Sequence, residues 1–236
     1  MIDSRTPIVD GPRPAVSVDV VVLTLRAARL HVLLIERGAP PFLGQWALPG
    51  GFLHVGEGNR GGESLDEAAA RELVEETGLT PESVLLEQFG VFGAPGRDPR
   101  GRTITVAFFA LVRPELAAFV KSGTDAAAAA FVCVDDARGL AFDHDVILQA
   151  ALERLRDDVK RGAPVAFHLA PDPFTIRELQ EVHEALLHSP GAKSGGAGPF
   201  RKRFDRLLEE RKVERVEGKR VTSKRPAMVF RAVLLG

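Results

Sequence analysis

The sequence has little cysteine, no long apolar run and no apolar N-terminal segment. Its single cysteine, Cys133, excludes an internal disulfide, and the surrounding run FVCVD favours a buried small side chain. The longest apolar runs, residues 16–25 and 126–134, are too short to span a bilayer. The N-terminal segment MIDSRTPIVDGPRP has acidic residues, arginines and prolines in place of a signal peptide's apolar core. The sequence therefore predicts a cytoplasmic protein with no membrane association.

The composition, 45% hydrophobic and 27% charged, is that of an ordinary globular protein. Its 236 residues suffice for one large domain, or for a medium domain with a small one. The net charge of −1 hides an uneven distribution, because residues 193–236 hold 13 Lys and Arg against 5 Asp and Glu. A basic tail is typical of nucleic-acid binding, although a solvated helix face or a disordered tail has the same composition.

The first 162 residues alternate between strand and helix patterns. A capping box of Ser64 and Glu67 predicts where one helix begins, and Gly78 stands where it ends. The pattern predicts strands at 16–25, 30–36, 84–92, 102–112 and 131–135, and helices at 64–77 and 146–161. It also predicts loops at 38–51 and 124–130.

A domain boundary is predicted where this alternation stops. Residues 162–173 contain four prolines or glycines and no helical period. We therefore predict a first domain over 1–162, a linker over 163–173 and a second domain over 174–236. The second domain should hold a helix capped by Thr175 and ending near residue 188, a loop at 189–199 and a helix at 200–210. Two strands around a turn at Gly218, with a basic loop, should follow.

Three glutamates concentrate charge on the helix at 64–77. Glu72, Glu75 and Glu76 are spaced i, i+3 and i+4, so they share one face of the helix. Their mutual repulsion would be relieved by a hard divalent cation such as Mg²⁺ or Mn²⁺, and an exposed acidic face is the alternative. Glu63, eight residues before Arg71, is close enough to pair with it and to fix the preceding loop.

Gly51, Glu63 and the segment RELVEETGL at 71–79 together resemble the Nudix box. The resemblance implies an α/β fold, the Nudix α/β/α sandwich with a mixed sheet. It also implies that Glu72, Glu75 and Glu76 bind the metal beside a diphosphate, with Glu75 and Glu76 as catalytic residues in an active enzyme. Eleven residues separate Gly51 from Glu63 where the family pattern has five. This insertion of six residues, in the loop that positions the helix, favours a sensor over a catalyst.

Three further segments, LGQWALPGGFLHVG, GRDPRGRTITVAFFALV and LAFDHDVILQAALERLR, resemble the Nudix proteins that handle ADP-ribose. The resemblance implies that the loop with Arg97, Arg100 and Arg102 lies close to the ligand. Arginine suits a diphosphate because its planar fork binds phosphate oxygens in pairs, although Arg100 and Arg102 could equally form a solvated turn.

Three other residues are candidates for ligand binding. Arg37, just after the second predicted strand, could bind the pyrophosphate. Trp46 could stack on an adenine or plug its glycine-rich loop. His144 could be a polar contact, a general base or a structural histidine.

The order helix, loop, helix and basic strand pair in the tail is that of a winged helix-turn-helix. The second helix begins FRKRFDR, which puts Arg201, Lys202 and Arg203 in a first turn that can face the major groove. Cations there oppose the helix dipole, a cost explained if this end faces DNA. A basic hairpin that packs on the first domain or stabilises a dimer is the alternative. The predicted DNA contacts are Arg201, Lys202, Arg203 and Arg206 on the helix and Lys219, Arg220, Lys224 and Arg225 around the wing.

With FTIRELQEVHEALL at its start and RPAMVFR near its end, the tail resembles the Nudix-related transcriptional regulators of NAD metabolism, the NrtR family. The resemblance implies a homodimer that binds a palindromic operator in double-stranded DNA at NAD-biosynthesis genes. It also implies that ADP-ribose, or a related nucleoside diphosphate, is sensed by the first domain and releases the DNA.

Two hypotheses follow from these patterns. In the first the protein is such a repressor, and the basic tail favours it. In the second it is a Mg²⁺-dependent ADP-ribose pyrophosphatase in which Glu76 or a neighbour activates water, and the intact glutamates favour it.

Overall fold

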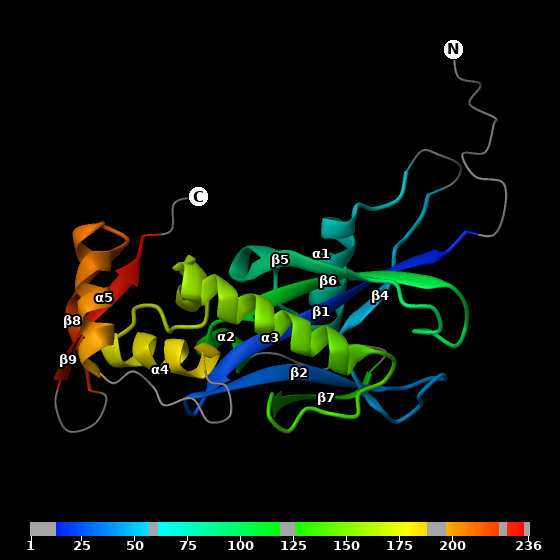
Figure 1. Cartoon of the computed structure of the whole chain (residues 1–236), viewed down its shortest axis with the longest axis horizontal. Helices are drawn as coiled ribbons and strands as arrows, with labels where there is room; N and C mark the ends of the chain where they lie inside the picture. The colour runs from blue at the N-terminus through cyan, green and yellow to red at the C-terminus, as the bar shows by residue number, and fades with distance from the viewer. Residues whose placement is uncertain (1–12, 57–60, 119–125, 188–196, 222–225, 234–236) are drawn as a thin grey trace, which may run out of the picture.

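The computed structural model describes residues 13–56, 61–118, 126–187, 197–221 and 226–233. Its first domain is built on a seven-stranded mixed sheet with the strand order β3-β2-β1-β6-β5, to which β4 adds on β1 and β7 on β2 (Figure 1). Strands β1 and β6 are parallel, and the other pairs are antiparallel. The strands are β1 (Ala15–Arg26), β2 (Arg29–Arg37), β3 (Trp46–Ala47), β4 (Gly50–Phe52), β5 (Leu85–Phe92), β6 (Thr103–Val112) and β7 (Ala126–Cys133).

Helices cover both faces of this sheet. Alternate side chains of β1 point to opposite faces, so Val20 packs in the core under α1 (Leu65–Thr77) and Val21 in the core under α3 (His144–Arg161). This is the predicted α/β/α sandwich. The first domain also holds the short helices η1 (Pro81–Ser83) and α2 (Pro114–Ala117). Among the described residues, no helix is both long and apolar enough to cross a membrane.

The start and end of α1 follow directly from its sequence. The amide of Glu67 donates to the Ser64 hydroxyl at 3.2 Å, and the Glu67 carboxylate accepts from the Ser64 amide at 2.7 Å. Gly78 ends the helix in the left-handed conformation, with φ of 73°. The capping box and the glycine stop are therefore confirmed.

The second domain has the predicted order of a winged helix-turn-helix. It consists of α4 (Ile176–Leu187), α5 (Ala197–Glu209) and an antiparallel ribbon of β8 (Val213–Val221) and β9 (Pro226–Ala232). Thr175 caps α4 through its hydroxyl, which accepts from the amide of Glu178 at 3.2 Å. Phe204 of α5 meets Phe230 of β9 edge to face, with ring centroids 4.9 Å apart, so the helix and the wing share a core.

The two domains are joined by one continuous apolar core. Leu155 of α3 and Leu179 of α4 belong to the same buried cluster, and α3 packs along α4 (Figure 1). The predicted linker at 163–173 is part of this junction, because it folds into the short helix η2 (Pro164–His168), which packs against α3 and α4. Asp172 pairs with Arg113 of the first domain at 3.3 Å and with Arg231 of β9 at 3.0 Å.

Three local predictions are wrong. Residues 126–130 form a strand and not a loop, because pairing with β2 overrides the low strand propensity of alanine. Gly218 lies at a shift of register inside β8 and not at the turn, as glycine within a strand often marks a bulge. Helix α5 begins at Ala197, so Arg201 and its two neighbours lie beyond the first turn. The argument from the helix dipole therefore does not apply to them.

The predicted loop at 38–51 also contains regular structure. Strands β3 and β4 form there by pairing with β2 and β1, respectively. Both are too short for sequence alternation to reveal them, since two or three residues carry no period.

Candidate functional site

The Arg71 guanidinium lies at the centre of the acidic cluster on α1. It binds the Glu63 carboxylate through two nitrogens, at 2.9 and 2.7 Å, as the spacing of the two residues predicts. Its Nη1 donates to Glu72 at 2.7 Å and to Glu75 at 3.1 Å, and its Nη2 donates to the carbonyl of Phe52 at 3.2 Å. The charge repulsion among the carboxylates is thus relieved by an arginine.

The insertion before α1 leaves these contacts intact. Val55 and Gly62 pair as an isolated antiparallel bridge, so the inserted loop leaves and returns at one point. The chain therefore still places Glu63 beside Arg71, because a long surface loop adds little strain to its ends. Hydrogen bonds from Arg71, and then one from the His54 amide, lower the pKa of Glu63 to about 2.

Glu72 is the buried carboxylate of the cluster, with 6% of its surface exposed. Burial raises the pKa of Glu72, and the contact with Arg71 opposes that shift. Its carboxylate packs directly on Gly51, where an added Cβ would overlap with the carboxylate oxygen. A side chain at position 51 would therefore displace the Glu72 carboxylate from its present position.

The three predicted metal ligands do not form a ready metal site in this arrangement. Within the described part of the chain, no three Asp, Glu, His or Cys side chains converge at distances that would hold a metal ion. Glu72 and Glu75 instead share Arg71, and 53% of the Glu75 side chain is exposed. Their oxygen donors suit Mg²⁺ chemically, but their geometry does not fit the ion.

A cavity of about 140 Å³ lies beside this helix, at the end of the sheet. Its walls come from β1, β2, β4, the loop before β6 and the start of α3, segments far apart in the sequence. Four of the six predicted ligand-binding residues line it. The lining residues central to its chemistry are Asp19, Arg37, Arg97, Arg100, Phe142 and His144.

One wall of the cavity is a buried ionic cluster around Arg97, whose side chain is 4% exposed. Arg97 binds Asp143 through two nitrogens at 2.9 and 2.7 Å, and Asp19 at 3.2 Å. Burial alone would lower the pKa of Arg97, but Asp143 and Asp19 raise it. Because both carboxylates already occupy this guanidinium, Arg97 holds the cavity wall together.

His144 completes this wall. The amide of Leu48 donates to its Nδ1 at 2.8 Å, which leaves Nε2 as the ring N–H, 3.4 Å from the Asp19 carboxylate. Burial by itself would raise the pKa of Asp19, but His144 and then Arg97 lower it. His144 thus has a structural role, which was one of the alternatives, and it also lines the cavity.

The opposite wall carries two arginines over one aromatic ring. The guanidinium carbons of Arg37 and Arg100 lie 4.8 and 5.5 Å from the centre of the Phe142 ring. Burial, and then the charge of Arg100, lowers the pKa of Arg37. Arg100 binds the buried carboxylate of Asp98, whereas Arg37 donates only to carbonyl oxygens among the described residues. An anion between the two guanidiniums would relieve their repulsion.

A second, more open cavity of about 380 Å³ shares Arg97 and Phe142 with the first. Phe42 lines it and meets Phe142 edge to face at 4.8 Å. Pro95 and Pro99 add further apolar surface. A charged cavity thus adjoins one with aromatic walls, an arrangement that suits a ligand with a diphosphate and a flat ring.

Trp46 and Arg102 lie away from the lining of both cavities. Trp46 packs against the main core, which agrees with the alternative that it plugs its loop. Arg102 is exposed and donates to the carbonyl of Gly93 at 2.6 Å. Asp19, Phe142 and Asp143 were not predicted from the sequence as site residues. The FDHD segment was the available signal for Asp143 and Phe142, whereas Asp19 lies within an apolar strand and gave none.

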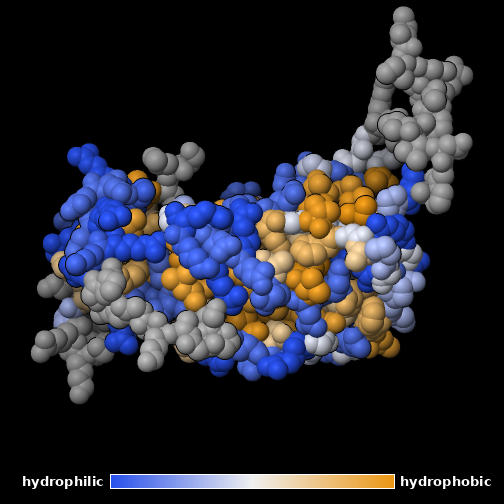
Figure 2. Space-filling view, viewed as in Figure 1, coloured by the Kyte–Doolittle hydropathy of each residue, from blue (hydrophilic) through white to orange (hydrophobic). Residues whose placement is uncertain are grey.

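The surface of α5 is the candidate nucleic-acid interface. Figure 2 shows that the end of the molecule formed by the second domain is mostly hydrophilic. Arg201, Lys202 and Arg206 are exposed there, and Arg201 pairs with Asp205 at 3.2 Å. Arg203 differs, because its Nη2 donates to the carbonyl of Val159, in the last turn of α3, at 3.0 Å. Arg203 therefore connects the helix to the first domain in this conformation.

The predicted wing contacts divide in a similar way. Arg220 pairs with Glu178 of α4 at 2.8 Å and donates to the carbonyl of Pro173 at 2.7 Å, so it holds the wing against α4. Lys219 belongs to β8, and its side chain lies outside the described part of the structure. Lys224 and Arg225 lie outside the described residues.

The sandwich with its glutamate helix defines a Nudix-domain protein with an appended winged helix. A family model for the NUDIX domain matches residues 13–153, and one for the NrtR DNA-binding winged helix domain matches residues 166–232. The chain is 34% identical over 228 residues to the ADPR responsive transcriptional repressor NtrR of Acinetobacter baylyi, covering 95% of this chain and 84% of that protein. These matches show that the chain belongs to the NrtR family.

Two further comparisons agree with this assignment. The crystal structure of Shewanella oneidensis NrtR complexed with a 27mer DNA superposes with a TM-score of 0.71 at 32% identity, covering 92% of this chain and 93% of that one. The first domain alone resembles an ADP-ribose pyrophosphatase of Methanocaldococcus jannaschii, with 40% identity over 136 residues, 58% of this chain and 72% of that protein. The family of the whole chain is thus regulatory, whereas its first domain is also similar to an enzyme.

Proposed function

We propose that this protein is a transcriptional repressor of NAD-metabolism genes that releases DNA when ADP-ribose binds its first domain. The main support for this proposal is that α3 extends from the ligand cavity to the DNA-binding helix. At its start His144 lines the first cavity and the N-cap residue Asp143 lines the second, and at the other end the Val159 carbonyl accepts from Arg203 of α5. The 18 residues of α3 span about 27 Å, so one rigid helix joins the cavity to the DNA-binding helix.

ADP-ribose fits the two adjoining cavities. Arg37 and Arg100 would bind its diphosphate, because arginine forks match phosphate oxygens and these two repel each other without an anion. Phe42 and Phe142 would contact its adenine in the neighbouring cavity. A ligand that contacts Asp143 or His144 would shift the start of α3, and this shift would alter the contact between Val159 and Arg203.

DNA binding would use the exposed face of α5 and the wing. Arg201, Lys202 and Arg206 would contact the major groove, and Lys219, Lys224 and Arg225 would contact phosphates. We propose a homodimer on a palindromic operator in the cytoplasm, since two copies of α5 match two half-sites. Val91 of β5 and Val146 of α3, each 60% exposed, provide apolar surface for a second copy. The division into 1–162, 163–173 and 174–236 remains part of this proposal.

Removing two cations from α5 should weaken DNA binding at least tenfold. The variant combines Arg201→Ala with Lys202→Ala, and each lost base or phosphate contact costs about 1 kcal/mol or more. The measurement is gel retardation of a palindromic NAD-gene promoter fragment at several salt concentrations. The matched control combines Arg138→Ala with Lys160→Ala, which removes the same charge from the first domain. Equal retardation by the wild type and the α5 variant would refute the proposed interface.

ADP-ribose should release the promoter fragment from the wild-type protein. In the combined variant Arg37→Ala and Arg100→Ala, release should need at least tenfold more ADP-ribose, because both diphosphate-binding forks are lost. Retardation titrated with ADP-ribose measures the effect, and the variant should bind DNA normally without ligand. Release at the same ADP-ribose concentration in both proteins would place the ligand elsewhere.

Hydrolysis of ADP-ribose is the second candidate function, because Glu72, Glu75 and Glu76 are all present. Nudix hydrolases generally use divalent metal ions, and Mg²⁺ or Mn²⁺ at these residues would require Glu72 and Glu75 to leave Arg71. Incubation of the protein with ADP-ribose and Mg²⁺, followed by chromatography for AMP, separates the two functions. We expect no AMP above the control without protein.

A further inference from the structure

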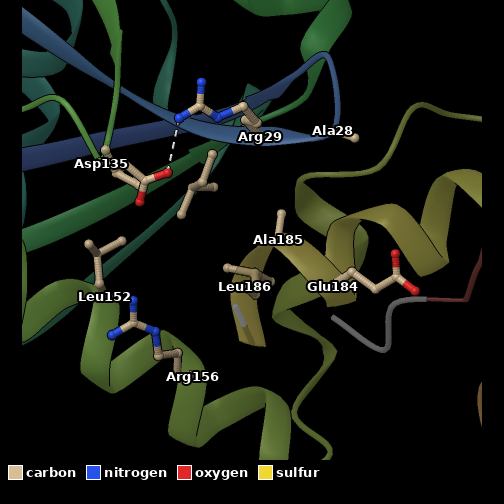
Figure 3. A pocket seen from close by; sticks show the side chains of 10 residues that line it. Ala28, Arg29, Asp135, Leu152, Arg156, Glu184, Ala185 and Leu186 are labelled. Atoms are coloured by element: carbon tan, nitrogen blue, oxygen red, sulfur yellow. Dashed lines mark hydrogen bonds and ion pairs between the residues drawn. The ribbon is translucent and has the colours of Figure 1, made fainter. Parts of the chain in front are cut away.

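A further cavity lies between the two domains. It has a volume of about 490 Å³, within the range of small-molecule sites, and residues of α3, of α4 and of the turn between β1 and β2 surround it (Figure 3). The turn between β1 and β2, the segment after β7 and helix α3 supply its first-domain wall, and α4 supplies the other. Its apolar lining residues are Ala28, Leu30, Val134, Leu152, Ala185 and Leu186.

Two arginines and two carboxylates line this cavity, but Arg156 and Glu184 are not paired with each other. Arg29 is paired with Asp135 at 3.1 Å, and the Glu184 carboxylate accepts from Gln180 of its own helix at 2.8 Å. Figure 3 shows the Glu184 side chain directed away from Arg156, which rises from α3 toward the cavity. Among the described residues, the buried Nε of Arg156 has no hydrogen-bond partner.

A buried guanidinium N–H without a partner is costly, and a bound anion that accepts from the Arg156 side chain would offset this cost. We propose that this cavity is a second ligand site, in which Arg156 binds the carboxylate of a small organic acid. The planar guanidinium matches a carboxylate in a two-pronged contact, and the apolar walls would enclose the hydrocarbon or aromatic body of the acid. The site is separate from the cavity at Arg37 and Arg100, since the two share no lining residue among those that the structure describes.

The position of the site gives it a regulatory consequence. Leu152 and Arg156 belong to α3, whereas Ala185 and Leu186 belong to α4, so a bound acid contacts both domains at once. An acid that fits one relative placement of the domains better than another shifts the population toward that placement. The binding itself does not depend on the proposed response to ADP-ribose.

The experiment uses 4-fluorobenzoate as the probe, observed by fluorine NMR with the full-length protein. The wild-type protein should broaden or shift the probe resonance at millimolar concentration or below. Arg156→Met keeps most of the side-chain volume and removes the fork, so it should weaken binding at least tenfold. Lys160→Met, one turn further along the same helix, removes the same charge from the surface and should bind as the wild type does.

Three controls make the proposal refutable. The thermal midpoint of Arg156→Met should be equal to or above that of the wild type, because the variant removes an unsatisfied buried donor. The neutral 4-fluorobenzamide should bind at least tenfold more weakly than the acid. Inorganic phosphate at the same concentration as the acid should not displace it. Absence of binding to the wild type, equal binding to Arg156→Met, equal binding of the amide or displacement by phosphate would each overturn the proposal.

Discussion

Arg97→Met should destabilise the protein by about 3–5 kcal/mol at neutral pH, the loss typical of breaking a buried ion pair. Arg97 is 4% exposed and is the cation that offsets both Asp19 and Asp143. Methionine fills most of the same space, so the lost charge and not a cavity dominates the effect. Urea unfolding followed by circular dichroism at pH 7 measures the free energy of unfolding. The contacts between α3 and the second domain should be lost only at the urea concentrations that unfold the whole protein.

Two comparisons identify the cause of this loss. Arg138→Met, at an exposed surface arginine, should change stability by less than about 0.5 kcal/mol. Adding Asp19→Asn and Asp143→Asn to Arg97→Met should restore much of the loss, because no buried charge then lacks a partner. A cost below about 1 kcal/mol for Arg97→Met would show that water, and not Arg97, stabilises these carboxylates.

Acid should destabilise the protein through His183 of α4. Burial, and then the nearby charge of Arg203, lowers the pKa of His183 from about 6.5 to about 4, although its hydrogen bond to the Leu179 carbonyl opposes the shift. The unfolded chain takes up a proton here below about pH 6.5, and the folded chain only below about pH 4. Stability is therefore complete above pH 6.5 and falls by roughly 3 kcal/mol as the pH approaches 4.

The measurement is the difference between wild type and His183→Leu in free energy of unfolding, from pH 7.5 to pH 4. The variant should lose stability at neutral pH but lack this acid-dependent decrease, since leucine has no proton to gain. The His183 ring meets Phe200 of α5 at 5.1 Å, so protonation should also loosen the packing between the two helices. Parallel curves for the two proteins across this range would exclude His183 as the cause.

The predictions from local patterns succeeded where the local chain supplies the contact. The capping box at Ser64, the stop at Gly78 and the pair of Glu63 with Arg71 all connect residues that are close in sequence. The effect of the inserted loop on local geometry could not be predicted from its length. Its length indicated a change at the helix it precedes, and the bridge between Val55 and Gly62 shows that Glu63 nevertheless returns to Arg71. Sequence spacing counts the residues in a loop, but it does not show whether the ends of the loop meet.

The roles of single arginines were harder to predict from the sequence. Arg203 and Arg220 are basic residues in the positions expected of DNA contacts. In the structure they bind the Val159 carbonyl and the Glu178 carboxylate, respectively, within the protein. Arg97 was expected to bind ligand, and two carboxylates already hold it. An arginine serves equally well in all of these roles, so only its neighbours in space decide among them.

The sequence on its own determined the order of helices and strands, the winged helix and the glutamate helix, because periodicity and caps are local properties, and its resemblance to the Nudix box implied the sandwich. The tertiary structure alone decided the geometry of the sites. It brought Asp19, Arg97 and His144 together from separate segments, gave Glu72 and Glu75 an arginine to share, and joined the two domains through α3. Such contacts depend on packing between residues far apart in the sequence, and a pattern of neighbouring residues carries no information about them.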